Sequence, residues 1–100
     1  MIVHVHEDSS ITLDDPNTFT AFSVLAPGRE SAQIAAAFGA DAEADGDEHV
    51  WIAISRLHAL GEKHGDADWR KGCDGMLAFA TSKGWVDEAR QLVRAHIERP

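Results

Sequence analysis

The chain has 100 residues, 44% of them hydrophobic, and a formal net charge of −8 at pH 7. This length predicts a single domain, 1–100, because independent domains usually hold about 50–200 residues. The acidic balance disfavours nucleic acid and anionic membranes as partners, since both select a basic surface. No apolar run approaches the roughly 20 residues of a membrane span. A lone cysteine excludes a disulfide scaffold, so we expect a reducing, cytoplasmic setting.

The charge is unevenly distributed along the chain. Residues 1–48 contain ten acids and one base, for a net charge of −9, whereas residues 49–100 have a net charge of +1. The net charge of −9 is expected to create a negative field around residues 41–48 that would attract a basic surface.

The first 27 residues predict short strands. Ile2, Val3 and Val5 form a β-prone opening, and Ser9-Ser10 offers a turn before a second strand over 11–13. Turn chemistry follows at Asp14-Asp15-Pro16-Asn17. Residues 18–25 then predict the main strand, with a short helix opened by the proline as the alternative.

A helix and a hairpin are expected next. Residues 29–38 predict a helix, because Ile34 and Phe38 lie four apart and Gly39 provides a left-handed stop. Asp45-Gly46 favours a tight hairpin whose second strand is Val50-Trp51-Ile52.

The second half of the chain predicts three helices, over 53–63, 66–82 and 86–98. The first ends near Gly65, and Asp66 is the expected N-cap of the second. The apolar stripe expected to face inward in the second helix consists of Trp69, Cys73, Met76, Leu77 and Ala80.

The last predicted helix has an apolar stripe of its own, formed by Val86, Ala89, Leu92, Val93 and Ile97. A short turn at Gly84 would join it to the preceding helix as an antiparallel pair. The expected fold is therefore α+β, a small, mainly antiparallel N-terminal sheet with helices that ends in a C-terminal αα-hairpin.

An acidic segment, residues 41–48, lies between the helices predicted over 29–38 and 53–63. It resembles a calcium-binding loop if Asp41 is its first position and Gly46 its sixth. The twelfth position, which must supply a bidentate carboxylate, is Ile52, so we interpret the segment as a solvated hairpin tip.

Three histidines are candidate metal ligands. Alternation along a strand puts His4 and His6 on one face, and a third ligand would have to come from a distant segment, with His49 as the candidate. Cys73 lies on the predicted inner stripe of a helix, which favours a buried thiol over a nucleophile.

The sequence contains none of the phosphate-loop, dinucleotide, nucleophile-elbow or zinc-protease motifs. We therefore expect a non-catalytic interaction or accessory module without a cofactor, which docks to another protein or forms a homodimer. The alternative is a ligand- or metal-binding protein or enzyme that uses the His-x-His strand. The expected interaction residues are Asp41, Glu43, Asp45, Asp47, Glu48, Trp51 and Trp85.

Overall fold

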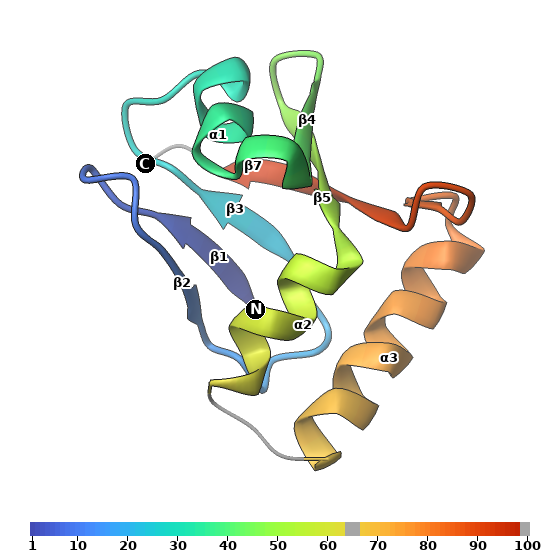
Figure 1. Cartoon of the computed structure of the whole chain (residues 1–100). Coiled ribbons are helices and arrows are strands. Elements are labelled where there is room, and N and C mark those ends of the chain that lie inside the picture. The colour runs from blue at the N-terminus through green and yellow to red at the C-terminus, as the bar shows by residue number, and fades with distance from the viewer. Residues whose placement is uncertain (64–66, 99–100) are drawn as a thin grey trace.

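The structure, a computed structural model, describes residues 1–63 and 67–98 (Figure 1). Its strands are β1 (Ile2–Val5), β2 (Ile11–Asp14), β3 (Ser23–Leu25), β4 (Ala42–Asp45), β5 (His49–Ala53), β6 (Val86–Asp87) and β7 (Leu92–Glu98). Its helices are α1 (Ser31–Ala37), α2 (Ile54–Glu62) and α3 (Ala67–Ser82), and a 3-10 turn, η1 (Gly39–Asp41), follows α1.

The strands of the described residues join one mixed sheet in the order β2-β1-β3-β7-β5-β4, and β6 pairs with one end of β7. β3 is parallel to both of its neighbours, β1 and β7, whereas the other pairs are antiparallel. The last strand in the chain therefore lies in the middle of the sheet, between strands from the two halves of the sequence.

One face of the sheet forms the core. Alternate residues of each strand point to this face, among them Val3, Val24, Val50, Ile52, Val93, Ala95 and Ile97, each no more than 3% exposed. Figure 1 shows α1 and α2 lying over this face, and Ile34 and Leu57 are their fully buried contributions. Burial of these aliphatic side chains, at about 25 cal/mol per Å² of apolar surface, is the main stabilising contribution.

The opposite face of the sheet, which no described helix covers in Figure 1, is called the open face below. The strand registers place on it the residues that alternate with the core, including His4, Thr12, Asp14, Glu43, Asp45, His49, Trp51, Arg94 and His96. α3 packs instead against α2 and β6. The open face therefore carries polar and aromatic groups next to one another.

The predicted arrangement of a small, mainly antiparallel N-terminal sheet is wrong. The fold is α+β, but the sheet is mixed and includes strands from the whole described chain. Of the residues expected to form the main strand, only Ser23–Leu25 do so, and residues 18–22 form a turn and an irregular segment. The pairing of β3 with β7, far away in sequence, decides this topology.

The predicted C-terminal αα-hairpin is also wrong. Residues 86–98 form β6, a turn over residues 88–91, and β7, rather than a helix. Buried and open-face side chains alternate along β7, as in a strand: Val93, Ala95 and Ile97 are buried, whereas Arg94 and His96 point to the open face. Two neighbouring strands, β3 and β5, supply the hydrogen-bonding partners that make this segment a strand.

Several local predictions are confirmed. The first two strands form the antiparallel pair β1–β2, and β4 and β5 form a hairpin in which Gly46 has the positive φ of +65° that favours glycine. The helices expected over 29–38 and 53–63 are present as α1 and α2. The inner stripe of α3 is buried as predicted, whereas the expected cap Asp66 lies outside the described residues.

Candidate functional site

The candidate site lies at a break along one edge of β7. β6 pairs with residues 92–93 of this strand, and β3 pairs with residues 96–98. Between these two partners, the backbone N–H of Arg94 donates to the carbonyl of Trp85 at 2.8 Å. The segments that precede β3 and β6 therefore meet here, underneath α3.

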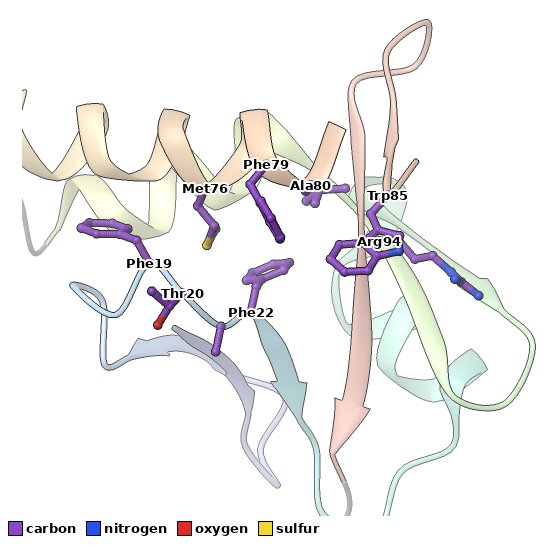
Figure 2. A pocket seen from close by; sticks show the side chains of 10 residues that line it. Phe19, Thr20, Phe22, Met76, Phe79, Ala80, Trp85 and Arg94 are labelled. Atoms are coloured by element: carbon purple, nitrogen blue, oxygen red, sulfur yellow. The ribbon is translucent and has the colours of Figure 1, made fainter. Parts of the chain in front are cut away.

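A hollow of about 340 Å³ opens at this break, and it is called the aromatic hollow below. It is lined by Phe19, Thr20, Ala21, Phe22, Met76, Phe79, Ala80, Trp85, Val93 and Arg94. Figure 2 shows Phe79 of α3 and Phe22 pointing toward one another, with Phe19 and Trp85 at opposite ends. This volume and this predominantly apolar lining are typical of small-molecule pockets.

Two aromatic side chains at the rim of the aromatic hollow are unusually exposed. Phe79 is 58% exposed and Trp85 is 42% exposed, and their ring centroids lie 6.3 Å apart in an edge-to-face arrangement. The ammonium of Lys83 lies 5.5 Å from the centre of the Phe79 ring. Since exposed apolar surface has a free-energy cost in water, covering these rings would be favourable.

Local packing fixes the wall that contains Phe19. A Cβ atom at Gly72 of α3 would stand 2.4 Å from Phe19 Cε2, so only glycine lets the ring lie this close to the helix. The indole N–H of the buried Trp69 donates to the carbonyl of Pro16 at 2.8 Å and ties the same segment to α3. The Met1 amino group donates to the carbonyls of Thr18 and Ala21, each at 2.9 Å. The contacts with Gly72, Trp69 and Met1 therefore fix the position of this wall.

A smaller hollow of about 170 Å³, called the histidine hollow below, adjoins the aromatic one on the open face. It is lined by Phe22, His49, Trp85, Arg94 and His96. His49 and His96 are directly opposite in the register of β5 and β7, and their ring centroids lie 5.3 Å apart. A concave site therefore contains two histidines and a guanidinium.

The charges around the histidine hollow are partly balanced. Arg94 Nε donates to Asp45 Oδ2 at 2.7 Å. The pKa of His49 is lowered from its ordinary value, first by burial and then by the nearby Arg94 and His96, against the opposite influence of Asp45 and Glu48. His49 is therefore a neutral imidazole near pH 7.

The acidic segment predicted as an interaction site largely pairs within the chain. Asp41 accepts from Arg56 at 2.9 Å, Glu43 from Arg90 at 2.7 Å and Asp45 from Arg94 at 2.7 Å. Asp47 also interacts within the chain, and the backbone carbonyl of Glu48 accepts from Ile97 N–H at 2.8 Å. Three carboxylates of this segment are thus offset by arginines from the second half of the sequence.

The two predicted interaction tryptophans lie on either side of Arg94. Trp51, on β5, is half-buried on the open face and lies opposite Arg94 in the strand register. Trp85 lies on the other side of β7, at the rim of both hollows. Trp85 therefore lines both hollows, whereas Trp51 lines neither.

The structure does not bring the three candidate metal ligands together. His4 and His6 stack on each other at 3.9 Å between ring centroids, where His4 Nδ1 lies 3.0 Å from Asp14 Oδ2 and His6 Nε2 lies 2.7 Å from Thr12 Oγ1. His49 lies on β5, which β3 and β7 separate from β1. Among residues 1–63 and 67–98 no group of three or more His, Cys, Asp or Glu side chains is arranged to hold a metal ion.

Cys73 has the environment of a core residue. Its side chain is fully buried, and burial, together with the smaller influence of the nearby Asp74, raises the pKa of its thiol to about 11. The fraction of thiolate at neutral pH is therefore very small, and a nucleophilic role is disfavoured.

Sequence reasoning missed most of the lining of the two hollows. Phe19, Phe22, Phe79, Arg94 and His96 were not singled out by any motif. The alternation of apolar and polar residues over 93–98 was the available signal, because it places Arg94 and His96 on one face of a strand.

None of the helices in the described parts of the chain is long and apolar enough to span a membrane. Comparison of the sequence and structure with protein-family models, curated proteins and solved structures finds no match. Function is therefore inferred from the geometry of the two hollows.

Proposed function

We propose that the chain is a binding module that holds a small aromatic molecule in the aromatic hollow. The observation that supports this proposal is a cavity of about 340 Å³ surrounded by aromatic side chains and Met76, with Phe79 and Trp85 still 58% and 42% exposed. An aromatic ligand would cover these surfaces and form edge-to-face contacts worth about 0.5–1.5 kcal/mol each beyond area burial.

The test uses naphthalene-2-carboxamide, a neutral aromatic probe, and measures its affinity by titration calorimetry. The variant Phe79→Ala removes a ring from the rim of the hollow, and its fold should be intact because this side chain is largely exposed. We expect affinity to fall about tenfold, since 1.4 kcal/mol corresponds to one factor of ten.

The matched control is Lys71→Ala, which changes an exposed residue of the same helix that does not line the hollow. It should bind the probe like the unmodified chain. Unchanged affinity in Phe79→Ala, or no binding by the unmodified chain, would contradict the proposal.

A second candidate function is that of a homodimeric interaction module, favoured by the exposure of the adjacent Phe79 and Trp85 rings. A two-fold contact would pair this patch with the same patch of a second copy. Sedimentation velocity should then give a dimer at concentrations of tens of micromolar, and Phe79→Asp should give a monomer. A monomer in the unmodified chain would exclude this candidate and leave the ligand proposal intact.

A further inference from the structure

We infer that the ligand is an aromatic carboxylate, whose ring occupies the aromatic hollow and whose ionised head binds in the histidine hollow with uptake of a proton. This inference rests on the proposed function and specifies the ligand of the same site. The inference depends on the polar groups next to the aromatic hollow, which a purely apolar ligand would not require.

The two hollows are placed to hold one molecule. They share Phe22, Trp85 and Arg94 as lining residues, so the apolar space and the polar space are adjacent. A flat molecule with an acidic group at one end has the matching distribution of apolar and polar surface. Such a site, apolar with a few convergent polar groups, is the usual design of small-molecule pockets.

Arg94 has hydrogen-bond donors available at this position. Among the described residues, its guanidinium donates only to Asp45, through Nε. A guanidinium has five N–H donors in a planar fork that matches a carboxylate. The Nη nitrogens can therefore donate to a carboxylate while the ion pair with Asp45 persists.

The imidazoles must supply the remaining positive charge. Asp45 on β4 already neutralises Arg94, Glu48 in the β4–β5 turn lies close enough to His49 to influence it, and Glu98 follows His96 by two residues on β7. Beside a neutral His49, the carboxylates of Asp45 and Glu48 therefore outnumber the guanidinium of Arg94. Protonation of His49 converts the hollow into a site for an anion.

The direction of the coupling between protonation and ligand binding follows from the state of His49 in the free chain. The free chain keeps His49 neutral near pH 7, because burial, Arg94 and His96 lower its pKa. A bound carboxylate next to His49 favours the protonated form of that imidazole, so the complex holds more protons than the free chain and ligand. Affinity should rise as the pH falls, for as long as the carboxyl group of the ligand is ionised.

The experiment compares naphthalene-2-carboxylate with naphthalene-2-carboxamide, which have the same ring and differ in charge. Calorimetric titrations at about pH 7 in two buffers with different ionisation enthalpies measure the protons taken up on binding. We expect uptake of a fraction of a proton with the acid and none with the amide. Between about pH 8 and about pH 6, affinity for the acid should rise about three- to tenfold and affinity for the amide should stay constant.

A double variant, His49→Gln with His96→Gln, identifies the groups that take up the proton. It should abolish the pH dependence of affinity for the acid, and its thermal unfolding shows whether the fold is intact. Nuclear magnetic resonance titration of the His49 ring gives an independent measurement, because the carboxylate should raise the pH of its midpoint.

The outcomes separate this inference from the proposed function. Equal affinity for acid and amide without proton uptake would overturn the inference and leave the aromatic site standing. Proton uptake that persists in the double variant would overturn the role of the two histidines. Failure of both probes to bind would overturn the proposed function and the inference together.

Discussion

At the scale of single residues, Gly72 and Gly75 of α3 illustrate how the wall of the site is built. Both lie inside this continuous helix, where alanine in place of glycine would stabilise the helix by about 1 kcal/mol. A Cβ atom at Gly72 would stand 2.4 Å from the Phe19 ring, whereas a Cβ atom at Gly75 would have no neighbour within 4 Å. Only Gly72 is thus required by packing, and the residue it accommodates lines the aromatic hollow.

The two glycines therefore make a matched pair of substitutions. Gly75→Ala should raise the free energy of unfolding by about 1 kcal/mol, because it gains helix propensity without a clash. Gly72→Ala should lose this gain, since the Phe19 ring must move away from the new methyl group. Denaturant unfolding measures the stabilities, and naphthalene-2-carboxamide should bind less tightly to Gly72→Ala alone. Equal stabilisation by both substitutions would show that Phe19 does not pack against α3.

At the scale of secondary structure, the segment 86–98 contains two competing patterns. Val86, Ala89, Leu92, Val93 and Ile97 match a helical stripe, while Val93, Ala95 and Ile97 alternate with polar residues as in a strand. Local periodicity does not decide between them. The decision comes from β3 and β5, each of which would have one unpaired edge without β7 between them.

Two substitutions discriminate between these patterns. Ala95 is fully buried in β7, so Ala95→Leu should destabilise the fold by about 1–3 kcal/mol through overpacking. Ala89 is exposed in the turn before β7, so Ala89→Asp should change stability by less than about 0.5 kcal/mol. If residues 86–98 formed a helix, Ala89→Asp would be the destabilising variant and Ala95→Leu would be tolerated, because the apolar stripe of that helix includes Ala89 and excludes Ala95. Thermal unfolding of both variants provides the measurement.

The elements that could be predicted are those whose signals are local. The turn at Gly46, the stop near Gly39 and the stripe of α3 each depend on residues a few positions apart, and the structure contains all three. The predicted strand over 18–25 is mostly irregular for a different reason. Its aromatic residues Phe19 and Phe22 pack toward α3 rather than extending the sheet, and that helix is distant in the sequence.

At the scale of the whole molecule, pairing across long sequence separations also explains the charge asymmetry. The acidic first half is joined to the second by Arg56, Arg90 and Arg94, which pair with Asp41, Glu43 and Asp45. Composition alone indicates a bare acidic surface, because it cannot show which arginines lie opposite these acids. Exposed pairs of this kind contribute only about 0–1 kcal/mol each, so their main effect is on the surface potential.

The candidate site also depends on pairing between segments that are far apart in the sequence. Its lining comes from residues 19–22, α3, Trp85 just before β6, and the central strand β7, which meet only because β7 lies between β3 and β5. The histidine hollow adds His49 from β5 to this set. The sequence could indicate a helix with an exposed Phe79 and a strand with Arg94 and His96, but not that they line two adjoining hollows.

The most direct test of the account is the position of a bound aromatic acid. Nuclear Overhauser contacts between naphthalene-2-carboxylate and the labelled protein should connect the naphthyl ring to the Met76 methyl group and to the Phe79 ring. The end that carries the carboxylate should lie nearest His96. Contacts confined to residues outside the two hollows, or the reverse orientation with the carboxylate beside Met76, would contradict the account.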